Sequence, residues 1–267
     1  MKIGFIGAGK LGSSIIEGLK KSSLQAEITA YDPHSVFLEN LVQTYGLKTA
    51  ADNADLVNSS DVVVIALKPA IVGEAVKELK NLFKDKLVIS LAAGVNTSDV
   101  EEIAPDICIA RVLTNTPSAF GVGMSTISKG RNLSEAQLEL CKDIFTQVGE
   151  VIVIDEKFMD ISTSLAGSGP AFFYAVAQGF AKGCEKLGMS EKDAILLSAQ
   201  TMLGAAKMIT SSGQTPEELI KRVATPGGCT IEGLNYLASQ NLEKILIECM
   251  EVTAKKAAIL AHIGKEG

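Results

Sequence analysis

Hydrophobic positions in the first 155 residues alternate between short apolar runs and longer amphipathic stretches. One run, Asp61–Ala66, is rich in β-branched residues, as expected of a strand that is buried on both faces of a sheet. Strands are predicted at Lys2–Ile6, Glu27–Tyr31, Asp61–Ala66, Leu87–Leu91, Ile107–Arg111, Met124–Ile127 and Val151–Ile154. Helical patterns cover Leu11–Lys21, Phe37–Tyr45, Ile71–Phe83 and a segment that begins at Ser134. This alternation predicts a parallel α/β sheet.

The pattern changes near residue 157, after which almost no segment shows the two-residue period of a strand. Residues typical of helix starts and ends, such as Gly188 and the run Thr215-Pro216, separate long helical stretches. These stretches are Phe158–Leu187, Glu191–Ser211, Pro216–Ala224, Thr230–Ala238 and Leu242–Ile263. The chain is therefore predicted to form an α/β domain at residues 1–155 and an all-helical domain at residues 156–267.

The charge balance narrows the classes of partner. Lys and Arg number 25 and Asp and Glu 31, which gives a net charge of −6. Proteins that bind nucleic acids usually carry a basic surface, so we expect no nucleic-acid partner. The apolar run around residues 194–206 is shorter than the roughly 20 residues that a membrane span needs. The N-terminal sequence also lacks the features of a signal peptide. We expect a soluble, cytoplasmic protein with no membrane partner.

Histidine is scarce, and this limits the possible chemistry. The chain has only two histidines, His34 and His262, near opposite ends of the sequence. A His-rich metal site and a Ser-His-Asp triad are therefore not expected. The five cysteines lie too far apart for a C-x-x-C site, which predicts reduced thiols and no bound metal.

A glycine-rich motif follows the first predicted strand. Gly7-Ala8-Gly9-Lys10-Leu11-Gly12 has the pattern G-x-G-x-x-G and opens a predicted helix. In this context Gly7 permits a tight turn, and Gly9 lets the backbone approach a pyrophosphate. Gly12 allows the helix to pack closely on the strand, and the helix N-terminus attracts phosphate groups. The motif predicts a dinucleotide-binding turn.

The end of the second predicted strand bears on which dinucleotide binds. Asp32 lies 20 residues after Gly12. A carboxylate there accepts hydrogen bonds from the adenosine ribose hydroxyls and repels a 2′-phosphate, which favours NAD(H). His34 and Ser35 follow directly and leave binding of NADP(H) open.

Further strand ends carry candidate residues at the same predicted edge of the sheet, where open α/β folds bind ligands. Lys68, in Ala66-Leu67-Lys68-Pro69, is either a contact to an anionic ligand or a solvated lysine. The small residues of 90–95 would allow a nicotinamide close to the backbone. Arg111 is either structural or functional, and the polar cluster at 114–116 indicates the rim of a pocket.

Two segments stand out in the helical half. Ala166-Gly167-Ser168-Gly169-Pro170 precedes a strongly apolar helix. Thr225-Pro226-Gly227-Gly228-Cys229-Thr230 precedes another and presents two threonine hydroxyls beside backbone N–H groups at a helix start. That arrangement suits a small carboxylate.

Together these segments resemble the pyrroline-5-carboxylate reductase family. The resemblance rests on GFIGAGKLG at 4–12, ALKP at 66–69, LAAGV at 91–95, RVLTNTP at 111–117, LAGSGPAF at 165–172, LGAAKM at 203–208 and TPGGCT at 225–230. It covers nearly the whole chain in the family's order. Leu113 stands where the family usually has Met, and Ala224 departs from the family's first position in the second loop.

The resemblance implies reduction of the C=N bond of 1-pyrroline-5-carboxylate by NADPH or NADH, giving L-proline. It also implies a Rossmann-type sheet domain followed by a helical domain that forms a homodimer, with further assembly into rings of dimers. The implied cofactor-binding residues are Ile6, Gly7, Ala8, Gly9, Lys10, Leu11, Asp32, Ser35, Asn53, Ala66, Leu67, Lys68 and Ala93. The implied substrate-binding residues, contributed across the dimer, are Thr225, Gly227, Gly228 and Thr230.

The cyclic imine nitrogen is basic and is protonated before hydride transfer, so no strong side-chain acid is required. Thr230 is the candidate catalytic residue, through a hydrogen bond from its hydroxyl to that nitrogen. Two alternatives stay open. The first is another Rossmann oxidoreductase, such as an imine reductase for a different ring or a β-hydroxyacid dehydrogenase. The second is a non-catalytic protein that senses a dinucleotide.

Overall fold

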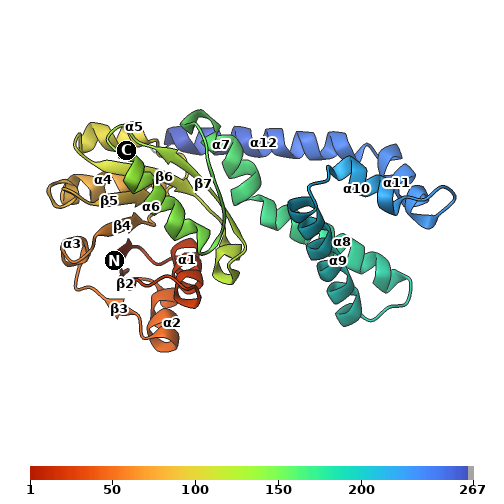
Figure 1. Cartoon of the computed structure of the whole chain (residues 1–267), viewed down its shortest axis with the longest axis horizontal. Coiled ribbons are helices and arrows are strands. Elements are labelled where there is room, and N and C mark those ends of the chain that lie inside the picture. Colours follow the sequence, from red (N-terminus) through yellow and green to blue (C-terminus); the bar gives the residue numbers. More distant parts are fainter. Residues whose placement is uncertain (264–267) are drawn as a thin grey trace. The chain divides into compact units, whose positions relative to one another are not determined.

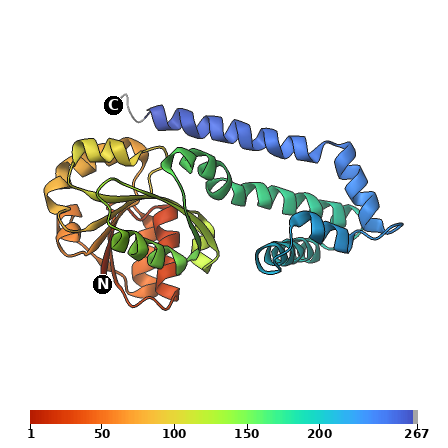
Figure 2. The same ribbon diagram turned by 45° about the horizontal axis from the view of Figure 1, so that its top comes forward.

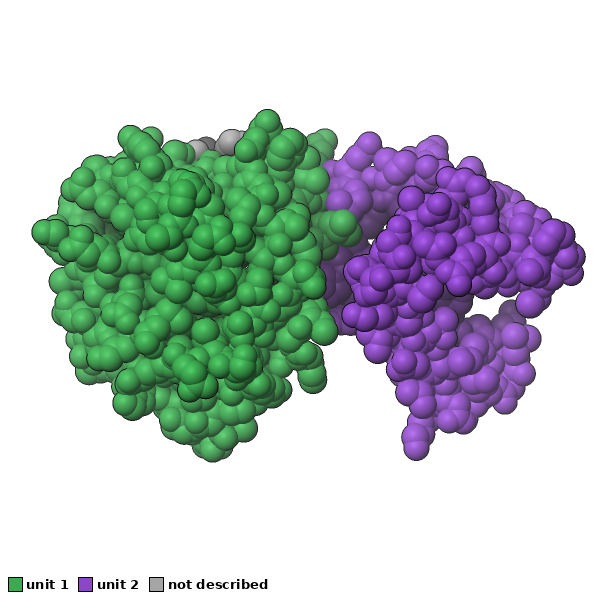
Figure 3. Space-filling model, in the orientation of Figure 1, with its two compact units in different colours: residues 1–168, 253–267 green, residues 169–252 purple. Residues whose placement is uncertain are grey.

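A computed structural model describes the backbone of residues 1–263 and the side chains of residues 1–258. The chain forms two compact units, which Figure 3 colours separately. Unit 1 comprises residues 1–168 and the chain from Thr253 onward, and unit 2 comprises Gly169–Val252. Residues 156–168 thus belong to unit 1 as a compact body, and the sequence-based division at 155/156 stays a prediction.

Unit 1 is built on an eight-stranded sheet with the order β3-β2-β1-β4-β5-β6-β7-β8. Each neighbouring pair among the six strands from β1 through β6 is parallel, and β7 runs antiparallel to β6. The crossover from β1 to β2 on one side and to β4 on the other gives the Rossmann-type arrangement, which confirms the predicted fold class. The strands are β1 (Lys2–Ile6), β2 (Glu27–Tyr31), β3 (Lys48–Thr49), β4 (Val62–Ile65), β5 (Leu87–Ser90), β6 (Cys108–Leu113), β7 (Gly123–Lys129) and β8 (Gly149–Val153).

The predicted parallel arrangement does not hold at the far edge of the sheet. β7 pairs antiparallel with β6, and β8 pairs parallel with β7. The connection between β6 and β7 is a short 3₁₀ turn, Thr116–Phe120. A parallel crossover needs a dozen or more residues, so a connection of this length can only reverse the chain.

Helices cover both faces of the sheet (Figures 1 and 2). On one face α1 (Lys10–Lys21), α2 (Val36–Tyr45) and α6 (Glu135–Thr146) contribute to one core cluster. On the other face α3 (Asn53–Asn58), α4 (Pro69–Leu79) and α5 (Thr97–Ile103) contribute to a second cluster. The strands supply fully buried side chains to both clusters, such as Phe5 and Ile65, because both faces are covered.

The hydrophobic pattern did not indicate three short elements: β3, α3 and α5. β3 has two exposed residues, and α3 and α5 have six and seven residues. Elements this short contain too few residues to show a repeating hydrophobic pattern. The two helices nevertheless have capping residues that are present in the sequence. In the structure, the Asp52 side chain accepts a hydrogen bond from the backbone N–H of Asp55, and Asn96 forms a capping box with Asp99.

The region predicted as one helix over Phe158–Leu187 is divided into several pieces. A 3₁₀ turn at Glu156–Phe158 leads into α7 (Met159–Ser162), a π-helical turn at Thr163–Gly167 and then α8 (Gly169–Lys186). The backbone N–H of Ser168 donates to the carbonyl of Thr163, five residues back, which is the wider π-type bond. The two glycines in this stretch, Gly167 and Gly169, accompany the irregular turn.

Unit 2 is all helical. Its helices are α8, α9 (Glu191–Ser211), α10 (Pro216–Val223), α11 (Cys229–Ser239) and the first part of α12 (Leu242–Ile263), so the predicted helices after residue 190 are confirmed within about a residue. Only Gly169, Ala181 and Ala194 are buried in this unit. No helix in the described part of the chain is both long and apolar enough to cross a membrane.

Candidate functional site

The glycine-rich turn lies between β1 and α1, at the carboxyl end of the sheet's central strand. Gly7 has φ +92°, a conformation that L side chains rarely adopt, and a Cβ there would lie 2.8 Å from the carbonyl oxygen of Ala66. A Cβ at Gly12 would lie 3.0 Å from the carbonyl oxygen of Gly7. Both glycines therefore have a packing role, as the motif predicts.

Gly9 has a different role because it is the open position of the turn. It is the N-cap of α1, and a Cβ there would meet no atom within 4 Å. No side chain caps the start of α1, and its first turn holds no acidic residue. The turn therefore has free space beside unpaired N–H groups, which is how a helix N-terminus receives a pyrophosphate.

Asp32 is fixed on this turn by two backbone hydrogen bonds. Its carboxylate accepts from the backbone N–H of Ala8 at 2.8 Å and from that of His34 at 3.1 Å. The Ser35 hydroxyl donates to the carbonyl oxygen of Ala8 at 2.5 Å and accepts from the backbone N–H of Leu38. Both side chains brace the glycine turn in addition to any ligand they contact, a role that the sequence did not reveal.

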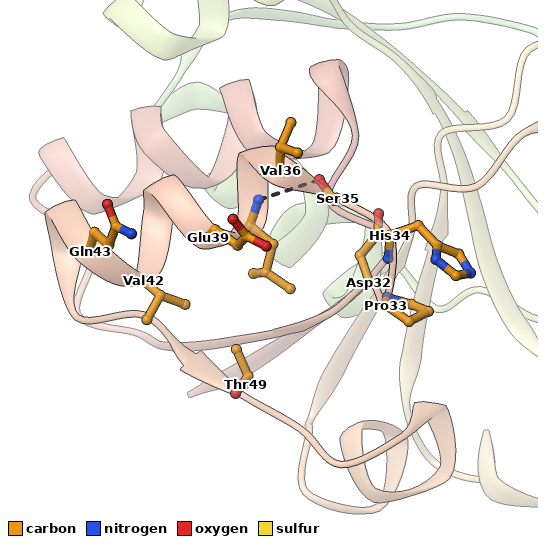
Figure 4. Close-up of a pocket in the computed structure, with 10 residues that line it drawn as sticks. Asp32, Pro33, His34, Ser35, Val36, Glu39, Val42, Gln43 and Thr49 are labelled. Atoms are coloured by element: carbon orange, nitrogen blue, oxygen red, sulfur yellow. Dashed lines mark hydrogen bonds between the residues drawn. The ribbon is translucent and has the colours of Figure 1, made fainter.

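A groove of about 470 Å³ opens beside Asp32, between the end of β2 and α2 (Figure 4). Its lining includes the carboxylates of Asp32 and Glu39 together with His34, and it includes no Lys or Arg. Glu39 is exposed on α2, and nothing in the hydrophobic pattern of this helix distinguishes it from other exposed polar residues. With two carboxylates and no permanent cation, the groove disfavours an additional phosphate.

Asn53 begins α3 and carries an unpaired polar atom. Its side-chain oxygen Oδ1 is buried and has no hydrogen-bond partner in the described structure. An orphaned buried acceptor normally finds a donor, and a ribose hydroxyl supplies one. Together with the open position at Gly9, this shows that the residues fit a dinucleotide.

The remaining predicted cofactor contacts lie at the ends of β4 and β5. Lys68 is exposed, is the N-cap of α4 and makes no ion pair within the described residues. Ala93 is exposed in the turn after β5, where the next residue, Gly94, has φ +77°. Since β4 neighbours β1 and β5 neighbours β4, these turns follow the glycine turn along one edge of the sheet.

The polar cluster after β6, interpreted from the sequence as the rim of a pocket, is mostly buried. Thr114 and Asn115 are buried, and only Thr116 is exposed. Thr114 bonds to the hydroxyls of Ser118 and Ser125, while Asn115 donates to the carbonyl of Ala166 and accepts from the N–H of Met124. Buried polar side chains of this kind need internal partners, and here they link strands and turns.

The Thr225–Thr230 segment is a turn into α11. Gly227 has φ +75°, and Gly228 is the N-cap of α11 without any side-chain cap. The hydroxyls of Thr225 and Thr230 have no hydrogen-bond partner within unit 2, so they are available to a ligand. The start of α11 thus presents free N–H groups and two hydroxyls on one turn, as predicted from the sequence.

Metal-binding clusters and disulfides are not seen. Within the described residues, no group of three or more His, Cys, Asp or Glu could hold a metal ion. None of the five cysteines, all of which lie among the described residues, forms a disulfide. His34 lies at the groove beside Asp32, and the side chain of His262 is outside the described residues.

Two family models match the chain. Residues 156–260 match the model described as pyrroline-5-carboxylate reductase dimerisation, and residues 2–94 match the model described as NADP oxidoreductase, coenzyme F420-dependent. The first match begins within the segment that leads from β8 to α7, and the second covers β1 to the turn after β5.

Full-length relatives agree with the family models. The chain is 39% identical over 240 residues to the pyrroline-5-carboxylate reductase of Methanosarcina acetivorans, covering 88% of this chain and 89% of the relative. It is 36% identical over 261 residues to the pyrroline-5-carboxylate reductase of Pisum sativum, covering 97% of this chain and 96% of the relative.

A solved structure shows the same fold with a cofactor. The pyrroline carboxylate reductase of Plasmodium falciparum, crystallised with NADP bound, superposes with a TM-score of 0.88 at 28% identity and covers 98% of each chain.

Proposed function

Because this chain belongs to the pyrroline-5-carboxylate reductase family, we propose that it reduces the C=N bond of 1-pyrroline-5-carboxylate to give L-proline. The observation that carries the proposal is that one chain holds two arrangements, one in each unit, that suit the two reactants. The glycine turn of unit 1 fits a dinucleotide, and the start of α11 in unit 2 fits a small carboxylate.

Residues of unit 1 would hold the nicotinamide dinucleotide, which when bound supplies the hydride. The N–H groups at the start of α1 would bind the pyrophosphate, and Asn53 would bind a ribose hydroxyl through its unpaired oxygen. The exposed Ala93 turn has no bulky side chain, so a flat ring could lie against its backbone. Lys68 would face the anionic part of the ligands.

Residues at the start of α11 would orient the substrate. The N–H groups after Gly228 and the hydroxyl of Thr225 would bind the ring carboxylate. The Thr230 hydroxyl would bond to the ring nitrogen. As hydride adds to the imine carbon, the π electron pair of the C=N bond moves to nitrogen, which keeps the proton that it already carries. The chain therefore needs to orient a protonated imine rather than supply a strong acid.

For the cofactor we propose NADH in preference to NADPH. The support is the charge of the groove at the end of β2, where Asp32 and Glu39 face a 2′-position without a Lys or Arg to pair with a phosphate. Asp32 is also held by Ala8 and His34 and cannot easily turn away. We expect Asp32→Ser to lower the ratio of kcat/KM for NADH to that for NADPH at least about tenfold, because the variant removes the repulsion between the Asp32 carboxylate and the 2′-phosphate of NADPH. An unchanged ratio in this variant would contradict the assignment.

For the assembly we propose a homodimer, with rings of dimers as the higher form. The support is unit 2, which exposes many large apolar side chains and buries almost none by itself. A second copy would cover them. The family resemblance implies that the substrate site is contributed across the dimer, so a second copy would also complete the site.

Turnover with a panel of substrates tests the function. NADH and NADPH oxidation is measured at equal enzyme concentration with 1-pyrroline-5-carboxylate, with the six-membered piperideine carboxylate and with 2-keto acids. We expect oxidation with the five-membered imine and much slower oxidation with the others. Turnover confined to 2-keto acids would indicate a hydroxyacid dehydrogenase, and dinucleotide binding without any turnover would indicate a sensor.

A further inference from the structure

The structure holds a buried cation that the proposed chemistry does not use. Arg111 lies within β6, and only 3% of its side chain is exposed. A guanidinium is always charged, and burying it is unfavourable unless partners are supplied. A buried guanidinium in the middle of a strand therefore needs a structural or functional explanation.

The partners of Arg111 come from two other segments of unit 1. Its Nη1 donates to Oδ1 of Asn96 at 2.8 Å and lies 3.5 Å from Oε1 of Glu156. Its Nη2 donates to Oδ1 of Asp160 at 3.3 Å. Asn96 is the N-cap of α5, whereas Glu156 and Asp160 belong to the turn and helix that follow β8. One planar side chain thus joins segments that are about 60 residues apart in sequence.

Glu156 strengthens the same connection with a second pair of bonds. Its carboxylate accepts from the backbone N–H of Thr97 at 2.7 Å and from the Thr97 hydroxyl at 2.8 Å. Thr97 is the first residue of α5. The start of α5 is therefore held by two side chains. The Arg111 guanidinium binds Asn96, and the Glu156 carboxylate binds Thr97.

The segment fixed in this way directly follows the Ala93 turn. β5 ends at Ser90, whose backbone lies opposite Arg111 in the sheet, and Leu91 is anchored by a hydrogen bond from its N–H to the carbonyl of Ile65. From there the chain passes through Ala93 and Gly94 to Asn96. The turn is thus anchored by the sheet at one end and by Arg111 and Glu156 at the other.

We propose that Arg111 is a positioning residue that fixes the Ala93 turn for the bound dinucleotide. This inference rests on the proposed function, because it assigns the turn to the nicotinamide side of the site. Arg111 would act through Asn96, Glu156 and Asp160, which it binds, and through the segment that they hold. A lysine cannot replace it fully, because a single ammonium group cannot reach Asn96 and Asp160 with the separate arms of a planar fork.

The test compares Arg111→Met and Arg111→Lys with Arg131→Met. Arg131 is a matched control because it pairs with Glu101, which lies on the same helix, α5, beyond the segment at issue. Hydrogen exchange at the amides of residues 91–97 is followed in the apo protein. We expect exchange to rise at least about fivefold in Arg111→Met, less in Arg111→Lys, and not in Arg131→Met.

Kinetics then separate positioning from a merely structural role. With the imine and NADH, we expect Arg111→Met to lower kcat about tenfold or more, because the hydride donor is held less firmly, while KM for the imine stays within about twofold. Arg111→Lys should fall between this variant and the wild type. Equal exchange at residues 91–97 in all proteins, or a lower melting temperature with unchanged kcat, would overturn the proposal.

The two proposals fail in different ways. If the wild-type protein neither binds NADH nor turns over the imine, the proposed function is wrong. The exchange data on the apo protein still decide whether Arg111 holds the 91–97 segment, since that measurement needs no ligand. Arg111→Lys, which keeps the charge, guards against loss of the fold in Arg111→Met.

Discussion

Unit 1 and unit 2 bury apolar surface in different ways. The two core clusters of unit 1 contain fully buried residues from every central strand and from the helices on both faces. In unit 2 the 21-residue helix α9 buries only Ala194, and half or more of the surface of Leu196, Leu197 and Leu203 is exposed. A unit without a core of its own is stabilised by association, so the comparison predicts that unit 2 depends on a second copy and unit 1 does not.

The largest effect is expected from a charge in the apolar surface of unit 2. Leu197 lines a groove of about 380 Å³ between α8 and α9, together with Phe180 and Met202. Leu197→Glu should raise the dimer dissociation constant at least 100-fold, about 3 kcal/mol or more, because a carboxylate would be buried without a partner. Sedimentation velocity over a range of concentrations measures it. Ile71→Glu, on α4 of unit 1 with similar exposure, is the control. A dimer that survives Leu197→Glu would remove α8 and α9 from the interface.

A cavity in the core of unit 1 should have an effect of similar size that is independent of association. Ile89 on β5 is fully buried. Ile89→Ala should lower the free energy of unfolding of unit 1 by about 2–5 kcal/mol through lost contacts and an unfilled cavity. Urea unfolding followed at two protein concentrations measures the change. For Leu203→Ala in unit 2, the midpoint should instead depend on protein concentration. The same concentration dependence in both variants would contradict the contrast between the units.

Thr230 tests the chemical contribution of unit 2. Thr230→Ala should lower kcat/KM for the imine by about 1.5–3 kcal/mol of transition-state stabilisation, the size of one hydrogen bond to a charged group. Steady-state kinetics at saturating dinucleotide measure it. Ser239→Ala is the control, because its hydroxyl bonds to the carbonyl of Tyr236 and accepts from the side-chain amide of Gln240, both at the far end of the same helix. Unchanged kinetics in Thr230→Ala would exclude this residue from the mechanism.

Substitutions at two glycines of unit 1 should affect different properties, the stability of the protein in one case and dinucleotide binding in the other. Gly7→Ala should destabilise the protein by about 1–3 kcal/mol, because it forces a side chain into a positive φ and against Ala66. Gly9→Ala should leave the melting temperature unchanged, since no atom lies near its added Cβ. It should nevertheless weaken dinucleotide binding, measured by fluorescence titration with NADH. Undiminished binding in Gly9→Ala would place the pyrophosphate elsewhere.

The smallest effect concerns a thiol in the core of unit 1. Burial raises the pKa of Cys141 from its ordinary value of 9.0 to about 12. The unfolded chain therefore loses this proton near pH 9 while the folded chain keeps it, so stability is fully present below pH 9 and declines as the pH rises toward 12. The slope from this group is at most about 1.4 kcal/mol per pH unit. Urea unfolding at pH 7 and pH 10 should show a smaller decline in Cys141→Ala than in the wild type. Equal declines would show that the thiol ionises in the folded state.

The sequence predicted elements well where local pattern and capping chemistry act together. β1, β2, α9 and α12 have the bounds that hydrophobic period and terminal residues indicated. The glycine turn and the start of α11 were also found from local signals, since left-handed backbone and an uncapped helix N-terminus depend on nearby residues. By contrast, the π-helical turn at Thr163–Gly167 was missed, because its i→i+5 bonding leaves no distinct hydrophobic period.

Long-range contacts were beyond the sequence. Asp32 was expected to accept hydrogen bonds from a ribose. No feature of the neighbouring sequence indicates that its carboxylate also accepts a hydrogen bond from the backbone N–H of Ala8, 24 residues away. The cluster at Thr114 and Asn115 was interpreted as a pocket rim because polarity alone does not distinguish an exposed rim from buried groups with internal partners.

By itself, the sequence determined the alternation of strands and helices, the dinucleotide turn, the change to an all-helical half and the family to which the chain belongs. These features depend on the hydrophobic period, on the backbone conformations that glycine allows and on helix capping, all of which act over a few residues. The tertiary structure alone decided the reversal at β7, the charge of the groove beside Asp32 and the partners of Arg111. Each of these depends on which distant segments meet, and the physical reason is that burial and electrostatics are set by neighbours in space.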